Sequence, residues 1–277
     1  MALPSDLQTN TCAEACPDPT PSLPEQCQKH FTEPFERDKV ISGGSTGIVV
    51  RLPCGHARKQ SYPDDTPRER EDRLLDFKRE YEVYGRIVNR PHFLKMIEFS
   101  EQGGIILQGV EGHTLRYYLE NQDTCIPLSK LIGWARDMAA ALHTLHAFSI
   151  IHADVKPDNM LLDESHKVYL IDFSGSWIDG KPGSSVESVR FFLPRDIMSD
   201  STVETDIFAY GSSLYEIMTS TQPYHDLDDE EVERLFEQGI FPSLELVPCG
   251  QIIKKCWTGE FRSIKDVQAA LQEIRGS

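Results

Sequence analysis

Four polar residues near the middle of the chain have the types and the spacing that phosphoryl transfer requires. Asp154 is followed two residues later by Lys156 and five residues later by Asn159, and Asp172 lies thirteen residues beyond Asn159. Asp154 can accept a hydrogen bond from an attacking hydroxyl, and Lys156 can balance charge on the transferred group. Asn159 and Asp172 offer the oxygen ligands that Mg²⁺ prefers. The set predicts transfer of a phosphoryl group from a metal-bound nucleoside triphosphate to a hydroxyl.

A polar turn between apolar strands is the structural alternative for each of these residues alone, because Asp and Asn favour turns. The four residues occur together, however, and apolar runs flank them at 160–162 and 168–171. That combination favours a catalytic loop over an ordinary turn.

Composition limits the classes of protein to which the chain can belong. Its 277 residues can bury the core of one large domain or of two lobes. The net charge of −16 argues against nucleic acid as a partner and is compatible with basic peptide substrates. The sequence shows neither a signal peptide nor an apolar run long enough for a membrane span. We therefore expect a soluble monomer with no membrane or nucleic-acid partner, located in the cytoplasm or alternatively in the nucleus.

Two local clusters have both a functional and a structural interpretation. Cys12, Cys16 and Cys27 could be metal ligands, but the seven cysteines include no CxxC pair, which favours stray thiols in a solvated tail. The acidic residues between 226 and 237 could be a docking site, but a solvated helix face is the commoner use of such a run.

The hydrophobic pattern divides the chain into a tail and one α+β domain. Residues 1–37 are rich in Pro, Ser and Thr, show no periodicity and predict a disordered tail. Residues 38–107 predict short strands around one helix, which begins at a Thr66–Glu69 capping box. The apolar stripe expected on that helix comprises Leu74, Phe77, Tyr81, Tyr84 and Val88. The later part is mainly helical, with helices expected over 129–147 (capped by Ser129), 206–218, 229–237, 249–257 and 263–275.

Residues 151–159, with the sequence IHADVKPDN, and residues 172–174, DFS, resemble the catalytic loop and the metal-binding motif of eukaryotic protein kinases. Ala153 stands where the family has Arg, and Ser174 where it has Gly. The resemblance covers residues 38–276 and implies a two-lobed fold: a β-rich N-lobe over 38–107, a hinge over 108–112 and a helical C-lobe over 113–276. It also implies ATP and Mg²⁺ as cofactors and a protein substrate that carries Ser or Thr.

The same resemblance implies a nucleotide site between the lobes. Residues 42–49, SGGSTGIV, match the family's glycine-rich loop, with Ser42 at its first glycine. Lys59 matches the phosphate-binding lysine, with neighbouring Arg58 as the alternative, and Glu80 matches its helical partner. Leu107 is the expected gatekeeper, and Ile41 and Ala57 would line the adenine pocket. The implied nucleotide-binding set is Ser42, Gly43, Gly44, Gly47, Val49, Lys59, Glu80, Gln108, Val110 and Leu161.

Motifs further along the chain resemble protein kinases more than small-molecule kinases. Residues 206–211, DIFAYG, match the helix that anchors the catalytic loop, and Trp257 and Arg262 match two late family residues. Residues 193–195, LPR, stand where the family has Ala-Pro-Glu, so Arg262 lacks its usual partner and Asp196 is the candidate substitute. As a whole, the sequence looks like the divergent Ser/Thr-kinase-like proteins of filamentous fungi.

The leading interpretation is an active, non-specific serine/threonine protein kinase, because Lys156 follows the Ser/Thr-kinase pattern. A pseudokinase or scaffold is the first alternative, supported by Ser42, Ser174 and the missing Glu. A small atypical kinase of a tRNA-modifying complex is the second. Since Ala153 carries no charge for a phosphate to compensate, we expect that activity does not require phosphorylation of residues 174–190.

Overall fold

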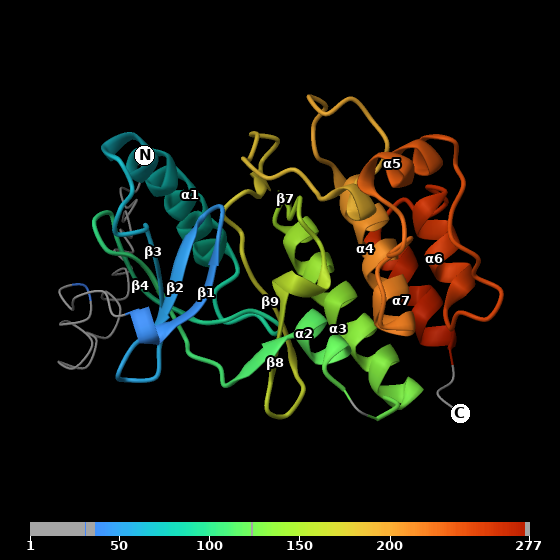
Figure 1. Cartoon of the computed structure of the whole chain (residues 1–277), viewed down its shortest axis with the longest axis horizontal. Coiled ribbons are helices and arrows are strands. Elements are labelled where there is room, and N and C mark those ends of the chain that lie inside the picture. Colours follow the sequence, from blue (N-terminus) through green and yellow to red (C-terminus); the bar gives the residue numbers. More distant parts are fainter. Residues whose placement is uncertain (1–30, 32–36, 123, 275–277) are drawn as a thin grey trace, which may run out of the picture.

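The computed structural model describes residue 31, residues 37–122 and residues 124–274. Within these residues the chain forms two lobes, a smaller one built on a β-sheet and a larger one built on helices (Figure 1). This arrangement confirms the predicted two-lobed α+β fold. The expected disordered tail lies almost wholly outside the described residues, as do Cys12, Cys16 and Cys27.

The N-terminal lobe contains a five-stranded antiparallel sheet with the strand order β1-β2-β3-β5-β4. Its strands are β1 (Val40–Gly44), β2 (Gly47–Arg51), β3 (Ala57–Gln60), β4 (Met96–Ser100) and β5 (Gly104–Leu107), and a short 3₁₀ turn, Arg37–Lys39, precedes them. One face of the sheet buries a small cluster of Val50, Leu52 and Ile106. The opposite face, which carries Ile105, joins the main core of the molecule. The two faces therefore have different partners, and the second faces the rest of the chain.

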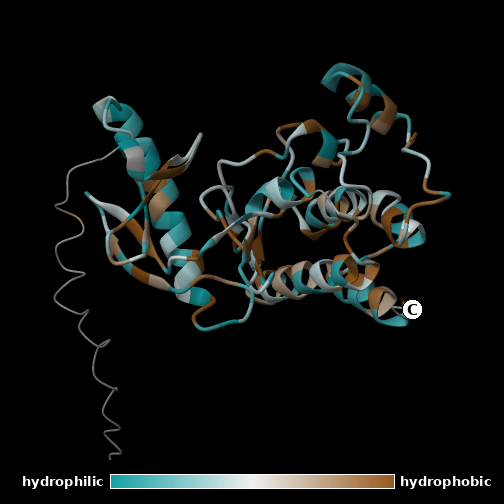
Figure 2. Cartoon of the chain, turned by 60° about the horizontal axis from the view of Figure 1, so that its bottom comes forward, coloured by the Kyte–Doolittle hydropathy of each residue, from teal (hydrophilic) through white to brown (hydrophobic). Residues whose placement is uncertain are grey.

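Helix α1 (Pro67–Arg86) begins at the predicted capping box, in which Thr66 and Glu69 cap each other's backbone N–H groups. Its inward face differs in part from the predicted stripe. Glu80 and Val83 take inward positions, whereas Tyr81 is 45% exposed and stacks on Phe99 at the rim. The other misplaced residue, Val88, lies beyond the helix end and is exposed. In Figure 2 this helix is mostly hydrophilic, and the strands beside it are more hydrophobic.

The C-terminal lobe is a group of helices around α3 and α4. Its helices are α2 (Leu115–Glu120), α3 (Leu128–Ala147), α4 (Val203–Thr219), α5 (Asp229–Glu237), α6 (Gly250–Trp257) and α7 (Ile264–Glu273). The predicted cap at Ser129 is wrong, because α3 begins one residue earlier, after Pro127, with no side-chain cap. Among the described residues, no helix is long and apolar enough to cross a membrane.

Helix α4 approaches α6 so closely that its glycine is required. A Cβ atom on Gly211 would lie 2.7 Å from the Cβ of Cys256. At the same contact the indole N–H of Trp257 donates to the Ser212 hydroxyl at 3.0 Å. These contacts fix the position of α4, and its first turn carries Asp206.

Two short sheets hold the loops that carry the candidate catalytic residues. One contains β6 (Gly112–Thr114), β8 (Met160–Asp163) and β9 (Val168–Leu170), and the other pairs β7 (Ile150–Ile151) with β10 (Trp177–Ile178). Residues 152–159 connect β7 to β8 through a 3₁₀ turn, Pro157–Asn159, and residues 171–176 connect β9 to β10. Because each loop is held at both ends by strands, the two loops are fixed beside each other. A further 3₁₀ turn, Val189–Phe191, precedes α4.

Candidate active site

One buried carboxylate on α4, that of Asp206, anchors the loop that carries Asp154. Asp206 is fully buried, and its two oxygens accept hydrogen bonds from the backbone N–H groups of His152 and Ala153, each at 2.9 Å. His146 Nε2 also lies 2.9 Å from this carboxylate. Ala153 has a left-handed backbone with φ +63°, which is uncommon for a residue other than glycine. Asp206 therefore stabilises a loop conformation that costs free energy in isolation.

Asp154 has one oxygen held by the protein and one that is unpaired. Its Oδ2 accepts a hydrogen bond from Asn159 Nδ2 at 2.8 Å and lies 2.8 Å from Lys156 Nζ. The same Asn159 nitrogen also donates to the Asp154 backbone carbonyl at 2.8 Å. Among the described residues, Asp154 Oδ1 is buried and has no hydrogen-bond partner. A buried unpaired oxygen is costly unless a ligand binds it, so this atom is suited to accept a hydrogen bond from an incoming hydroxyl.

Lys59 joins three elements in one ion-pair network. Its Nζ lies 2.9 Å from Glu80 Oε2 on α1 and 2.7 Å from Asp172 Oδ1 after β9. The lysine and Glu80 are buried, with 6% and 1% of their surfaces exposed. Three candidate residues from β3, α1 and the second loop therefore meet at one point between the lobes.

The charges of this network fix its protonation. Burial alone would lower the pKa of Lys59, but the carboxylates of Glu80 and Asp172 raise the pKa above its usual value. Burial alone would raise the pKa of Asp172, but the charge and hydrogen bond of Lys59 hold that pKa well below its usual range. At neutral pH the network therefore contains an ammonium group and an ionised Asp172 carboxylate.

Neighbouring residues orient Asp172 toward Lys59. Asp172 has φ +64°, and its Oδ1 accepts a hydrogen bond from the Ser174 hydroxyl at 2.5 Å. Phe173 is fully buried and packs edge-on against Tyr84 of α1, with ring centroids 5.2 Å apart. The serine that departs from the family pattern thus adds a hydrogen bond to the carboxylate.

Register in the sheet distinguishes Lys59 from Arg58. Arg58 lies opposite Val50 and Ile106, on the face that buries the small cluster, whereas Lys59 lies opposite Val49 and Ile105. On α1 a neighbouring carboxylate, Glu82, is exposed and pairs with Arg86 at 2.7 Å. The geometry brings Lys59 and Glu80 together, as the resemblance implied, and separates Arg58 and Glu82 from them.

The glycine-rich hairpin is held from outside by side chains that the sequence analysis missed. Gly47 has φ +136°, and a Cβ atom there would lie 2.5 Å from the Gln60 carbonyl, so the β1–β2 turn requires glycine. The Tyr62 hydroxyl donates to the Gly44 carbonyl at 3.1 Å, and Arg73 donates to the Ser45 carbonyl at 2.5 Å. In the sheet, Ser42 and Gly43 pair with Val49 and Ile48.

In the segment between the lobes, one backbone atom of the implied nucleotide-binding set already has a protein partner. The Val110 carbonyl accepts a hydrogen bond from Arg51 at 3.3 Å. Arg51 also pairs with Glu111 at 2.7 Å. A carbonyl has two lone pairs, so one remains for a ligand. The backbone N–H of Gln108 donates to the Lys95 carbonyl at 2.7 Å, and Leu161 on β8 packs at the edge of the main core.

The expected pair between Asp196 and Arg262 is not formed. Asp196 accepts a hydrogen bond from the Met198 backbone at 2.8 Å, and Arg262 is exposed. Instead, Arg195 pairs with the buried Glu187 at 2.9 Å within the same segment. The expectation was wrong because Arg195 occupies the place at which the family carries a Glu, so the segment needs an internal carboxylate rather than a distant arginine.

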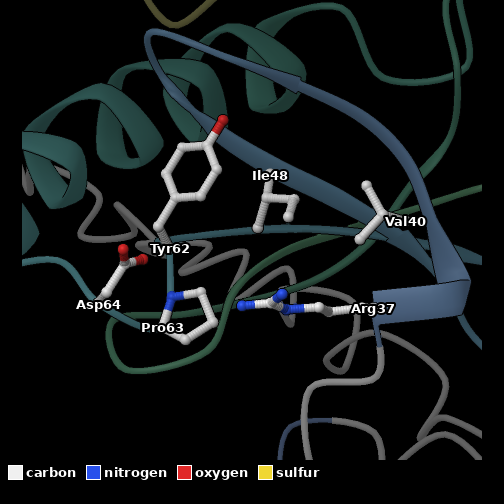
Figure 3. A pocket seen from close by; sticks show the side chains of 6 residues that line it. All are labelled: Arg37, Val40, Ile48, Tyr62, Pro63 and Asp64. Carbon is white, nitrogen blue, oxygen red and sulfur yellow. The ribbon is translucent and has the colours of Figure 1, made fainter.

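A cavity of about 500 Å³ lies apart from these groups, on the N-terminal lobe (Figure 3). It is lined by Arg37, Val40, Ile48, Tyr62, Pro63 and Asp64. None of the candidate catalytic, metal-binding or ion-pair residues lines it. The cavity and the candidate active site around Asp154 and Asp172 therefore lie in different places.

The chain matches the family of the protein kinase domain over residues 36–265. It belongs to that family. Curated relatives include the probable serine/threonine-protein kinase kinX of Dictyostelium discoideum, which is 28% identical over 67% of this chain and 17% of its own length. The RAF proto-oncogene serine/threonine-protein kinase of Xenopus laevis is 28% identical over 62% of this chain and 29% of its own. The serine/threonine-protein kinase PknD of Mycobacterium tuberculosis is 30% identical over 57% of this chain and 24% of its own.

The matched part of this chain thus spans less than a third of the length of each of these relatives. The match places the described lobes and the two loops within the protein kinase family. The likeness to proteins of filamentous fungi stays a prediction.

The ion-pair network predicts a specific pattern of stability changes. Lys59→Met leaves Glu80 buried beside no cation, and we expect the free energy of unfolding to fall by about 3 to 5 kcal/mol. Adding Glu80→Gln should restore part of this loss, because a neutral carboxamide is cheaper to bury. Urea denaturation measures both changes.

Lys78 on α1 offers a matched control for this experiment. It pairs with Glu101 at 2.6 Å, and both side chains are about half exposed. Lys78→Met should lower the free energy of unfolding by less than about 1 kcal/mol. If the Lys59 and Glu80 changes prove strictly additive, the two residues do not form the coupled pair described above.

Proposed function

We propose that the chain is an active serine/threonine protein kinase that transfers the γ-phosphate of ATP to a hydroxyl of a protein substrate. The observation that carries this proposal is the Lys59 network, which connects β3, α1 and the Asp172 loop in a single arrangement. The loop of residues 152–159, which Asp206 anchors, carries Asp154, Lys156 and Asn159. A scaffold that only bound partners would not need all of these groups assembled together.

In this proposal Asp154 is the general base, because one of its oxygens is held in place and the other is unpaired. Its Oδ2 is held by Asn159 and Lys156, so the carboxylate cannot rotate freely, and its unpaired Oδ1 is available to a substrate hydroxyl. In the proposed reaction Asp154 orients that hydroxyl and accepts its proton late. Lys156 lies beside the other oxygen, Oδ2, and offsets the negative charge that develops on the transferred group.

The donor atoms present suit ATP and Mg²⁺. Asp172 is ionised, and Asn159 uses its amide nitrogen for Asp154, which leaves its carboxamide oxygen as the atom that can bind a cation. Both are hard oxygen donors of the kind Mg²⁺ requires. When bound, Mg²⁺ neutralises charge on the phosphate oxygens. The nucleotide would be held by the glycine-rich turn and by two residues on the strands after it. The turn residues are Ser42, Gly43, Gly44 and Gly47, and the strand residues are Val49 on β2 and Lys59 on β3.

One observation favours the pseudokinase alternative. Asp172 Oδ1 already accepts bonds from Lys59 and Ser174, which leaves fewer lone pairs on that carboxylate for a metal. Its second oxygen and Asn159 still provide two ligands, and the network around Lys59 is complete. The atypical kinases of tRNA-modifying complexes receive less support, because the C-terminal lobe continues through α5, α6 and α7.

Asp154→Asn tests the proposed chemistry. The substitution keeps the size and the hydrogen bonds of the side chain but removes its capacity to take a proton. We expect turnover on a Ser-containing peptide to fall by about 10² or more, with ATP affinity unchanged. Radiolabelled phosphate transfer and calorimetric titration measure the two quantities.

Asp179→Asn is a suitable control for Asp154→Asn. Asp179 is an exposed aspartate paired with Arg86 at 2.6 Å, away from the loop. The turnover of the Asp179→Asn variant should stay within about twofold of that of the wild type. Equal turnover in wild type and Asp154→Asn would mean that Asp154 is not the base.

The segment after Asp172 is held by unmodified side chains, which supports activity without phosphorylation. Glu187 is buried and pairs with Arg195, and the Arg195 guanidinium stacks on Phe192 at 4.2 Å. Ser176 is fully buried and donates to the His152 carbonyl at 3.2 Å. Ser184 donates to Asp76 of α1 at 2.8 Å. One internal carboxylate, the buried Ser176 hydroxyl and the exposed Ser184 hydroxyl thus hold a segment that a phosphate orders in kinases with Arg before the catalytic Asp.

Phosphatase-treated protein should therefore keep most of its initial rate. The measurement is a burst of phosphate transfer, sampled before the protein can modify itself again. Loss of the rate, restored only when Ser176, Ser184, Ser185 or Ser188 is phosphorylated, would contradict the role assigned to Ala153. Glu187→Gln provides the internal comparison, because weakening the Arg195 pair should lower the rate whether or not the protein is treated.

A further inference from the structure

A polar cavity of about 340 Å³ lies directly beside the catalytic loop. Its lining includes Lys156 and Asp158 of that loop, Arg116 of α2, and Val189 and Arg190 of the segment before α4. Lys156 is 2.8 Å from Asp154, so the cavity opens next to the proposed base. A peptide that places its hydroxyl at Asp154 must leave a neighbouring side chain in or over this cavity.

Arg116 bonds two carboxylates: Asp158, which lines the cavity, and Glu216, which is buried. Its Nε and Nη2 donate to the two oxygens of Glu216 at 2.7 and 2.9 Å, and its Nη1 donates to Asp158. The Arg116 side chain is 16% exposed and Glu216 is 3% exposed. Burial alone would lower the pKa of Arg116, but its bonds to Glu216 and the nearby carboxylates raise the pKa, so the guanidinium stays charged. A bidentate, buried arrangement of this kind is strong and specific.

On the other side of the cavity, Arg190 bonds one carboxylate and two backbone carbonyls. Its guanidinium donates to Asp229 and to the backbone carbonyls of Tyr224 and Leu227, and its side chain is 14% exposed. Each of these carboxylates therefore already has a guanidinium partner. Lys156, which pairs with Asp154, is a third cation at the cavity wall.

The resulting charge pattern opposes the charge of the whole molecule. The net charge of −16 attracts basic peptides at a distance. The two carboxylates that line the cavity, Asp158 and Asp229, already have guanidinium partners. A basic side chain inside the cavity would therefore meet the cations Arg116, Arg190 and Lys156 and would find no unpaired carboxylate in the lining. It would lose its hydration without gaining a free carboxylate.

We propose that Arg116 is a specificity-determining residue that closes this cavity to basic side chains, so that the substrate places an uncharged hydrogen-bonding side chain there. This inference rests on the proposed kinase function. It follows that removing Arg116 would leave Asp158 at the cavity wall and the buried Glu216 without their guanidinium partner, and would turn the cavity into a site for Arg or Lys.

A peptide series tests the proposal. Each peptide carries one Ser acceptor, and each flanking position is varied among Gln, Arg and Glu. For the wild type we expect kcat/KM to be about tenfold lower with Arg than with Gln at one flanking position. Arg116→Met should reverse this preference at that position and leave the other positions unchanged, and added salt should weaken the new preference for Arg.

Companion variants separate specificity from folding. Arg116→Met leaves Glu216 buried and unpaired, so Arg116→Met/Glu216→Gln removes that buried charge while keeping Asp158 exposed to the peptide. Arg116→Lys retains the positive charge and should keep the wild-type order. Arg136 bonds the carbonyls of Leu271 and Ile274, away from the cavity, so Arg136→Met should change no preference. Thermal unfolding confirms that each variant is folded.

The outcomes distinguish this inference from the proposed function. A wild type that accepts Arg as well as Gln at every position would overturn the role of Arg116. A uniform loss of kcat/KM across all peptides in the Arg116→Met/Glu216→Gln variant would also overturn that role. If the wild type transfers no phosphate, the proposed activity fails, and fluorescence anisotropy with the same peptides then decides the cavity's preference by binding alone.

Discussion

The ammonium group of Lys59 is the point on which the arrangement of the two lobes depends. It is buried, so its desolvation is tolerable only while carboxylates surround it. Those carboxylates come from α1 in the N-terminal lobe and from the loop after β9. Each element therefore supplies what the others need: Glu80 and Asp172 compensate Lys59, and Lys59 keeps both carboxylates from being buried unpaired. If α1 or the Asp172 loop moved away, a charge would be left without a partner.

A second buried charge, Asp206, holds the Asp154 loop in place, as Lys59 holds the two lobes together. It binds two consecutive backbone N–H groups and thereby stabilises the left-handed backbone at Ala153. Helix α4 holds Asp206 in place because Gly211 lets it pack closely on α6. The departures from the family pattern are compatible with this framework. Ser174 adds a bond to Asp172, and Arg195 finds Glu187 inside its own segment.

Sequence reasoning succeeded where a residue type has few alternative uses. Helix α1 was predictable from its capping box. The change from strands to helices predicted an α+β domain, and the resemblance to protein kinases implied its two lobes. Alternation along β3 places Lys59 and Arg58 on opposite faces, since neighbouring side chains in a strand point to opposite sides. The resemblance favoured Lys59, and the sheet register places Lys59 on the face that meets Glu80. These inferences depend on local geometry, which the sequence determines directly.

The failures concern contacts between residues far apart in the sequence. Arg116 and Glu216 are separated by 100 positions, and neither belongs to a motif that marks it as one half of a pair. Arg51 and the Val110 carbonyl are 59 positions apart, and the sequence gives no sign of their contact either. Arg195 and Glu187 are only 8 positions apart, but a long guanidinium side chain binds whichever carboxylate the local fold brings near, and no motif marks that carboxylate. Tyr81 was misplaced because a charged residue, Glu80, took the inward position that an apolar pattern assigns to its neighbour.

Calorimetric titration of ATP, with and without Mg²⁺, into the wild type and Asp172→Asn tests the central claim most directly. The account predicts that Mg²⁺ tightens ATP binding to the wild type, because an ionised Asp172 held beside Lys59 offers the cation a ligand. Asp172→Asn should bind ATP with little or no dependence on Mg²⁺. Equal dependence on Mg²⁺ in both proteins, or none in the wild type, would contradict the assignment of Asp172 and Lys59 to a working phosphoryl-transfer site.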